Sequence, residues 1–164
     1  ILYTRQAIHP MKVESNLAAG FTLARLLLGR ALGGGTAERI LEGEEIAVRF
    51  DDGAEDAGRH LLSLVTGMER LVLRSRPFWG EGSGALHYTR ISDPAPRLLR
   101  NGCRLLYGGA RRDLQPRETY FSRKADSMTF DLRQPFTLDG ELFTPQPGVP
   151  VALSGDKRLS FLRY

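Results

Sequence analysis

The first repeating pattern along the chain is helical and covers residues 11–32. Apolar residues recur there at steps of four and three, which places them on one face of an amphipathic helix. The members of that face are Leu17, Phe21, Ala24, Leu28 and Ala31. Three glycines follow at 33–35, and glycine is typical just beyond a helix C-terminus. The pattern predicts one N-terminal helix that ends at this glycine run.

From residue 44 onward the period of the pattern changes to two. Ile46, Val48 and Phe50 alternate with polar residues, as in a half-buried strand. Short apolar runs then recur through residue 163, with Asp, Gly, Pro and Ser clusters between them. Such regularly spaced short strands predict an antiparallel β-sandwich.

One segment interrupts this strand pattern. Residues 95–107 carry apolar side chains near helical spacing, and Pro94 and Pro96 stand where a helix start tolerates proline. We therefore expect a mainly β protein, an antiparallel β-sandwich with an N-terminal helix and one crossing helix. Residues 1–43 would form a linker and helix packed on the sandwich, and residues 44–164 the sandwich itself, as one structural unit.

Composition fits a soluble globular domain, with 41% apolar and 26% charged residues. The net charge is +4, but the basic residues are scattered and form no block of the kind that binds nucleic acid. No apolar run approaches the roughly 18 residues of a membrane-spanning helix. The single cysteine, Cys103, excludes an internal disulfide, so we expect a reducing, cytoplasmic location.

Metal and phosphate sites have little support in the residues. One cysteine and three widely spaced histidines match no zinc pattern, so no metal site is predicted. The stretch "GGGTAE" at 33–38 ends a helix instead of opening one, which argues against a phosphate loop. We interpret His60 and His87 as structural histidines on or beside strands.

A second feature is the glycine-rich stretch "SRPFWGEGSG" at 75–84. Phe78 and Trp79 stand there beside a flexible loop, where an exposed aromatic pair would bind a ligand or an acyl chain. The alternative is that both rings fill one end of the sandwich, because large aromatic residues are mostly core residues.

A third feature is the pair of carboxylates in "FTLDGELFT" at 136–144. Asp139-Gly140 between apolar residues is a strong hairpin signal, so a plain turn explains that dipeptide. The same geometry leaves Glu141 unexplained. A reaction site with two acids at a hairpin is the alternative to the turn.

The segment "LDGELFTPQPGVPVALSGDKRLSFLR", residues 138–163, resembles the C-terminal end of the diacylglycerol/sphingosine-type lipid kinase family. Members end with an Asp-Gly-Glu element and two further strands. Residues 44–134 resemble the C-terminal sandwich of that family more weakly. The N-terminal helix is similar to the linker between the two domains of the family.

The resemblance implies a role for each residue of the motif. Asp139 would orient or deprotonate the acceptor hydroxyl, and Glu141 would contact the nucleotide or hold its magnesium indirectly. Gly140 would let the backbone turn tightly at the substrate cleft. The chain would then be the substrate-side domain of an ATP-dependent lipid kinase that phosphorylates a hydroxyl such as that of diacylglycerol.

Two departures from the family limit what this chain would do alone. It has no Gly-Gly-Asp-Gly-Thr loop, so we expect a fragment of a bacterial protein that is inactive without its N-terminal nucleotide-binding domain. ATP and Mg²⁺ would bind the full-length protein, and this fragment would bind neither tightly. The segment "SGALHYTRISDP" at 83–94 also lacks the paired acids that hold a structural metal in some relatives.

The expected partners are the lipid substrate, the nucleotide-binding domain and, transiently, a membrane surface, but not nucleic acid. The alternative from another functional class is a non-catalytic β-sandwich module that binds a lipid or a sugar through Phe78 and Trp79. A nucleic-acid binder is a third interpretation, which steep salt dependence of binding would favour.

Overall fold

The structure is a computed structural model of the 164-residue chain that describes residues 43–71, 74–109, 112–138 and 141–156. The helix predicted over residues 11–32 and the strand predicted near the C-terminus lie outside these ranges. Asp139 and Gly140 lie outside them as well.

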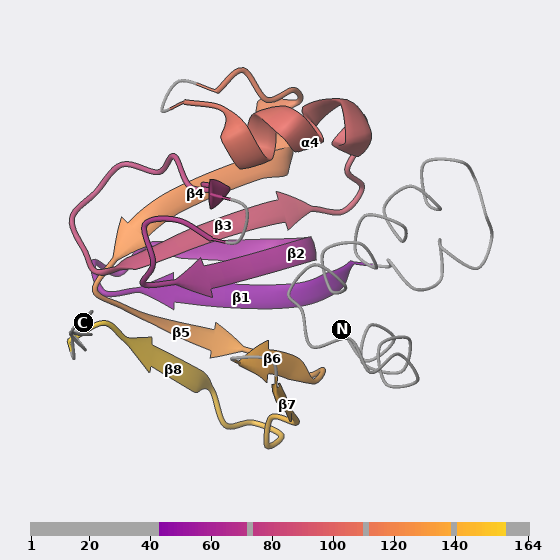
Figure 1. Cartoon of the computed structure of the whole chain (residues 1–164). Coiled ribbons are helices and arrows are strands. Elements are labelled where there is room, and N and C mark those ends of the chain that lie inside the picture. Colours follow the sequence, from indigo (N-terminus) through magenta and orange to yellow (C-terminus); the bar gives the residue numbers. More distant parts are fainter. Residues whose placement is uncertain (1–42, 72–73, 110–111, 139–140, 157–164) are drawn as a thin grey trace, which may run out of the picture.

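The fold is mainly β and antiparallel with a crossing helix, as the sequence predicted. Six strands form one sheet in the order β4-β3-β2-β1-β5-β8, and β6 pairs with β7 in a separate two-stranded sheet (Figure 1). The strands are β1 (Glu44–Phe50), β2 (Glu55–Thr66), β3 (Leu86–Ser92), β4 (Tyr120–Ala125), β5 (Ser127–Asp131), β6 (Phe136–Leu138), β7 (Glu141–Phe143) and β8 (Val151–Ser154).

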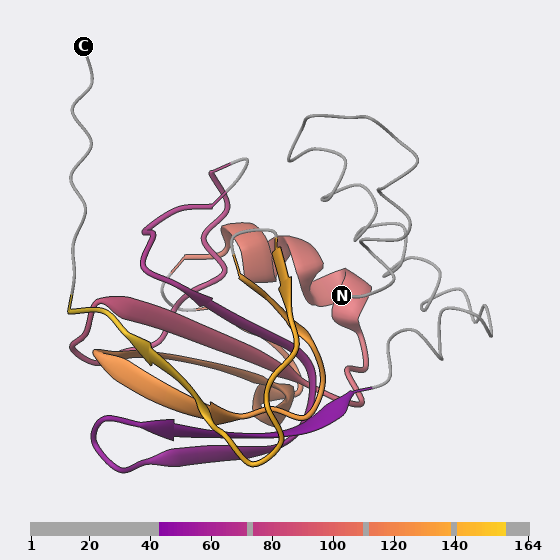
Figure 2. The ribbon, with the colours of Figure 1, turned by 90° about the horizontal axis from the view of Figure 1, so that it is seen from below.

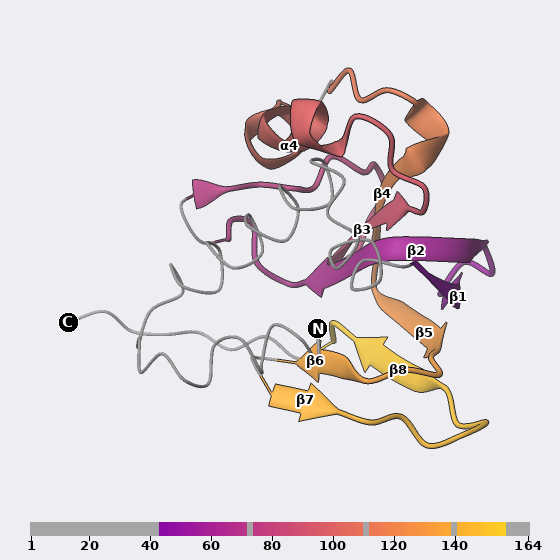
Figure 3. The same ribbon diagram turned by 90° about the vertical axis from the view of Figure 1, so that its right-hand side faces the viewer.

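A corner at Asp126 bends the large sheet over on itself. Asp126 is the only residue between β4 and β5, yet β4 is at one end of the strand order and β5 is next to the other end. Strands that switch layers at a bend make the corners of orthogonal sandwiches. The sheet therefore curls into two layers, with β1–β4 above β5 and β8 in Figure 3.

Three backbone segments hold this corner in place. The Asp126 N–H donates to the Asp51 carboxylate at 3.0 Å, and the Asp126 carboxylate accepts from the Ala85 N–H at 3.1 Å. The Asp126 carbonyl accepts from the Gly155 N–H at 2.8 Å. The corner thus bonds to the loop after β1, the start of β3 and the end of β8.

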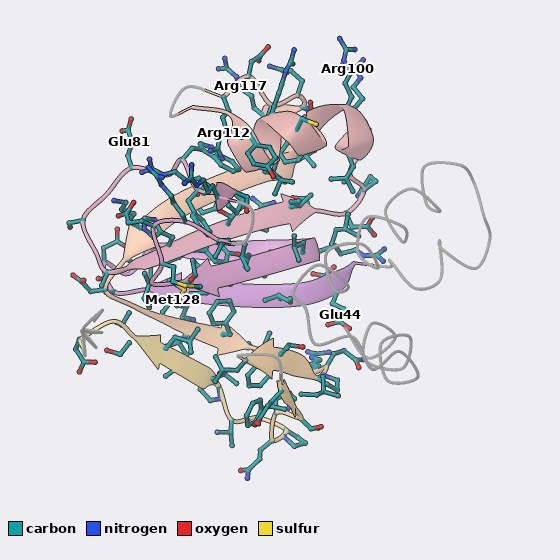
Figure 4. All side chains as sticks on the ribbon, in the orientation of Figure 1. Glu44, Glu81, Arg100, Arg112, Arg117 and Met128 are labelled. Carbon is teal, nitrogen blue, oxygen red and sulfur yellow. The ribbon has the colours of Figure 1, made fainter. Side chains whose placement is uncertain are left out.

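The main core lies between the two layers. Its aromatic members meet at angles: the Tyr88 ring lies 5.4 Å from that of Phe50 and 6.1 Å from that of Phe130. Met128 also points into this space (Figure 4). The buried core residues are Val48, Phe50, Tyr88, Ala125, Met128 and Phe130. The alternation predicted from Ile46 to Phe50 is the inward face of β1.

Helix α4 (Leu98–Tyr107) covers the outer face of the sheet beside β3 and β4, and lies behind the sheet in Figure 2. Leu105 packs there with Ile91, Leu114 and Tyr120 in a second buried cluster. The predicted crossing helix is thus confirmed, although it begins at Leu98 and not at residue 95. Arg97, in the left-handed region at φ 63°, precedes its first residue.

The C-terminal end of α4 is held by an arginine. The Arg112 guanidinium donates to the Leu105 carbonyl at 2.8 Å and to the Gly108 carbonyl at 2.9 Å. These are carbonyls that a helix end leaves without an intrahelical partner. Exposed arginines of this layer, including Arg100 and Arg117, point away from the sheet in Figure 4.

Candidate functional site

The hairpin predicted around the Asp-Gly-Glu sequence is present. Strands β6 and β7 pair antiparallel, with Leu138 opposite Glu141, so residues 139 and 140 are the connection between them. At the other end of the hairpin, the Phe136 and Phe143 rings stack with their centroids 5.8 Å apart. The two short apolar strands, β6 and β7, therefore form the hairpin that was predicted from the sequence.

Of the two acids of the motif, the structure describes only Glu141. Glu141 is the first residue of β7, and its side chain is exposed. Asp139 and the substrate-binding candidate Gly140 lie outside the described residues. In Figure 3, β6 lies beside β8 and β7 lies below them, on the side of the fold away from α4.

The aromatic pair at 78–79 is divided between interior and surface. Phe78 is only 4% exposed, and its ring stacks on that of His87 at 5.0 Å. Trp79 is half-buried, with the Arg112 guanidinium 5.2 Å from its ring centroid. The Trp79 N–H donates to the Ser122 hydroxyl at 3.2 Å. Phe78 thus has the packing role that the sequence left as an alternative, and Trp79 alone is partly accessible.

A β-bulge in β2 creates a polar site that the sequence did not predict. His60 pairs with Ser92, and the next pair is Leu62 with Ile91. Two steps along β2 therefore match one step along β3, and Leu61 is the extra, unpaired residue. A bulge re-aims the side chains that follow it. As a result, His60 and Ser63, three residues apart, meet through a 2.9 Å contact between the ring Nδ1 and the hydroxyl.

The bulge cluster, which we define as Asp56, His60, Ser63, Tyr88 and Arg90, contains two sets of hydrogen-bonded side chains. Asp56 accepts from the Tyr88 hydroxyl at 2.9 Å and from the Arg90 Nε at 3.0 Å. His60 and Ser63 form a second pair through the contact described above. Asp56 and Arg90 form an ion pair whose side chains are mostly covered. The cluster therefore contains a paired carboxylate and an imidazole.

The His60 ring is bonded at one nitrogen only. Its Nδ1 and the Ser63 hydroxyl share a hydrogen bond in which either group can donate. The other nitrogen, Nε2, is buried and has no hydrogen-bond partner among the described residues.

Burial keeps two side chains of the cluster uncharged. It lowers the pKa of His60 to about 4, against the smaller opposing effect of Asp56, so the ring is neutral at pH 7. Burial, and then the Asp56 charge, raise the pKa of Tyr88, so the phenol keeps its proton. His60 is therefore a neutral imidazole, and its buried Nε2 has no partner among the described residues.

Sequence reasoning assigned both His60 and His87 a structural role. His87 packs on Phe78 as such a residue would, whereas His60 keeps one nitrogen that no described residue bonds. The sequence did indicate that Asp56 and His60 lie on one face of a strand, because Asp56, Gly58 and His60 are spaced two residues apart. Ser63 shares this face only because of the bulge, so a strict two-residue alternation would place Ser63 on the opposite face.

No group of three or more metal-ligating side chains occurs among the described residues. In the same part of the chain, no helix has both the length and the apolar character needed to cross a bilayer.

The chain was compared with models of known protein families, with curated proteins and with solved structures, and none of these comparisons found a match. A function must therefore be argued from the residues of the chain itself.

Proposed function

We propose that this chain is the substrate-side domain of an ATP-dependent lipid kinase, which transfers a phosphoryl group from ATP to a lipid hydroxyl such as that of diacylglycerol. The hairpin is the observation that carries the proposal. Its register sets Leu138 opposite Glu141, and Asp139 and Gly140 are the two residues between them in the sequence. A mainly antiparallel fold with one crossing helix supports it as well.

In this proposal the motif supplies carboxylates to a phosphoryl transfer reaction. Such reactions depend mainly on positioning and on charge stabilisation, with a carboxylate that orients or deprotonates the attacking hydroxyl. Asp139 has that role, and Glu141 lies near the nucleotide. Magnesium is commonly bound by substrate phosphates with one or two carboxylates, which fits a motif of two acids.

The proposal assigns ATP and Mg²⁺ to the full-length protein and its nucleotide-binding domain, and makes this chain inactive alone. The protein would work in the cytoplasm, in transient contact with a membrane surface. If so, ATP with Mg²⁺ should leave the melting temperature of the isolated chain unchanged, because a ligand that binds the native state raises apparent stability. A clear upward shift at millimolar nucleotide would place a nucleotide site within this chain.

The decisive experiment is the Asp139→Asn variant in the full-length protein. Asparagine suits the same turn, so folding should be preserved, whereas loss of a general base costs about 10²–10⁴-fold in rate. Asp131→Asn, an exposed acid at the end of β5, is the matched control. We expect lipid phosphorylation to collapse only in the first variant, with both melting temperatures near wild type. Normal turnover in Asp139→Asn would mean that Asp139 is only a turn residue and has no part in catalysis.

The rival interpretation, a lipid- or sugar-binding module, depended on exposing Phe78 and Trp79 together. Phe78 lies in the interior, so the described surface offers only part of that aromatic pair. This geometry therefore does not favour a module that binds through both rings.

A further inference from the structure

Helix α4 presents a row of arginines on the outer side of the fold. Arg100 and Arg104 are four residues apart, so they lie on one face of the helix, and Arg97 stands just before its first residue. All three are exposed, and no ion pair within the described part of the chain joins any of them to an acid. Figure 4 shows that Arg100 points away from the sheet, as does Arg117 of the short 3₁₀ helix before β4. The row therefore faces solvent.

The charge along this part of the chain is all of one sign. Residues 94–112 include five arginines and no acid, a charge of +5, whereas the whole chain carries +4. The arginines are spread out in the sequence, and the helix brings Arg100 and Arg104 onto one face. The nearest acids in sequence are Asp113 and Asp93, of which Asp93 pairs with Arg59 at 3.5 Å. The outer side of α4 should therefore attract an anionic surface.

Apolar side chains accompany the arginines on α4. Tyr107 is 57% exposed and lies three residues beyond Arg104, so it continues the same row. Leu106, beside it, is 38% exposed. The opposite face of the helix, with Asn101 and Leu105, is buried. The outer face of α4 thus combines cations with exposed apolar groups, as do helices that lie in the headgroup region of a membrane.

An anionic bilayer suits this surface better than a protein or a nucleic acid does. Helix α4 has ten residues and is about 15 Å long, whereas a stable protein interface covers about 800 Å² on each partner. A nucleic acid would engage the arginines and leave Leu106 without an apolar partner. A bilayer offers phosphate groups and an apolar layer at the same surface, so it matches both kinds of side chain.

We propose that the outer face of α4 is a contact surface for an anionic membrane, with the three arginines at the lipid phosphates and with Leu106 and Tyr107 in the headgroup region. The inference goes beyond the proposed function and does not rest on it. In Figure 3 the β6–β7 hairpin lies on the side of the fold away from α4, so the two contacts are separate. A chain held through α4 would have to detach or turn before its hairpin could meet a lipid of that bilayer.

The test is co-sedimentation of the chain with vesicles of two compositions. One is phosphatidylcholine alone, and the other contains about 30% phosphatidylglycerol, an anionic lipid. We expect binding only to the anionic vesicles. That binding should fall steeply between about 0.1 M and about 1 M salt, because salt screens attraction between exposed charges.

Variants of matched charge locate the contact on α4. Arg100→Gln/Arg104→Gln removes two cations from the row and should weaken vesicle binding about 30-fold. Arg49→Gln/Arg133→Gln removes the same charge at exposed positions on β1 and after β5, and should stay within about threefold of wild type. All four side chains are exposed, so the melting temperatures of both variants should stay near that of wild type.

A second pair of variants tests the apolar part of the surface. Tyr107→Ser should weaken binding to anionic vesicles about tenfold, because the ring leaves water when the chain binds. Val149→Ser is the matched control, since this side chain is 53% exposed and lies between β7 and β8. It should bind as the wild type does.

Three results would overturn the inference. The first is a chain that does not bind anionic vesicles. The second is equal weakening by the two arginine pairs, which would assign binding to the net charge of the whole chain. The third is normal binding by Tyr107→Ser, which would leave only a charge contact. A duplex oligonucleotide that binds more tightly through the same arginines would then assign α4 to nucleic acid.

The two proposals fail separately. Vesicle binding by the isolated chain involves neither ATP nor turnover, so it tests the α4 surface alone. Phosphorylation of a dispersed short-chain diglyceride by the full-length protein involves no anionic bilayer, so it tests the kinase function alone.

Discussion

Lowering the pH from 7.5 to 5.0 should destabilise the fold through His60 more than through any exposed group. The ring is neutral and buried in the native state, and burial lowers its pKa from 6.5 to about 4. In the unfolded chain the same ring takes up a proton near pH 6.5. Between these values the unfolded state binds more protons, so the free energy of unfolding falls as the pH falls.

The magnitude follows from the two pKa values. The stability that depends on neutral His60 is fully present above about pH 6.5, and is lost progressively as the pH falls toward 4. The complete loss is about 3 kcal/mol, and the part already lost at pH 5.0 is about 2 kcal/mol. Few ordinary carboxyl groups titrate above pH 5, so this window isolates the histidines.

The assay is urea unfolding at pH 7.5 and pH 5.0, followed by the fluorescence of Trp79, the single tryptophan. The comparison is His60→Asn, whose side-chain amide can still donate toward Ser63. The substitution itself lowers the free energy of unfolding by an amount that is the same at both pH values. That amount cancels, because only the change in the free energy of unfolding between pH 7.5 and pH 5.0 is compared. Burial also lowers the pKa of His87, which remains in the variant and cancels as well.

We expect the wild type to lose about 2 kcal/mol more than His60→Asn over this interval. Equal losses would mean that His60 titrates normally in the native state, and the assignment of a buried neutral imidazole would then be wrong. A direct NMR titration of the His60 ring in the wild type gives the same answer if the variant does not fold.

Three further substitutions test the packing. Met128→Ala, at a core side chain 1% exposed, should cost about 2–5 kcal/mol in urea unfolding, whereas Met68→Ala, 59% exposed, should stay within about 0.5 kcal/mol. A large loss at Met68 would contradict the assigned core. Gly102→Ala in α4, where the new Cβ would meet nothing, should raise the melting temperature by an amount that corresponds to about 0.5–1 kcal/mol. A lower melting temperature would show that α4 is not a regular helix at that point.

The sequence predicted elements well where the pattern is local. The alternation through Val48 and Phe50 follows from pleating alone, and Asp139-Gly140 marks a hairpin whatever surrounds it. The apolar spacing over residues 95–107 likewise predicts α4 within three residues of its start. Each of these features depends on residues close to one another in the chain.

The features that the sequence did not show depend on strand pairing between distant segments. The bulge at Leu61 exists only relative to Ile91 on β3, so β2 alone cannot reveal that His60 and Ser63 share a face. Burial of Phe78 depends on stacking with His87. The candidate site was therefore predicted at the hairpin, which is local, and missed at the bulge cluster, which is not.

The single-residue corner at Asp126 also limits how this chain can change in length. One residue inserted or deleted there would exchange the inward and outward positions of β5, because side chains alternate along a strand. Met128 and Phe130 would then face solvent while their polar neighbours entered the core. The segment between β3 and β4, by contrast, leaves the sheet before β4 pairs with β3. Its length can therefore change without exchanging the inward and outward side chains of either strand. Length variation in this fold should therefore collect around α4 and be absent at Asp126.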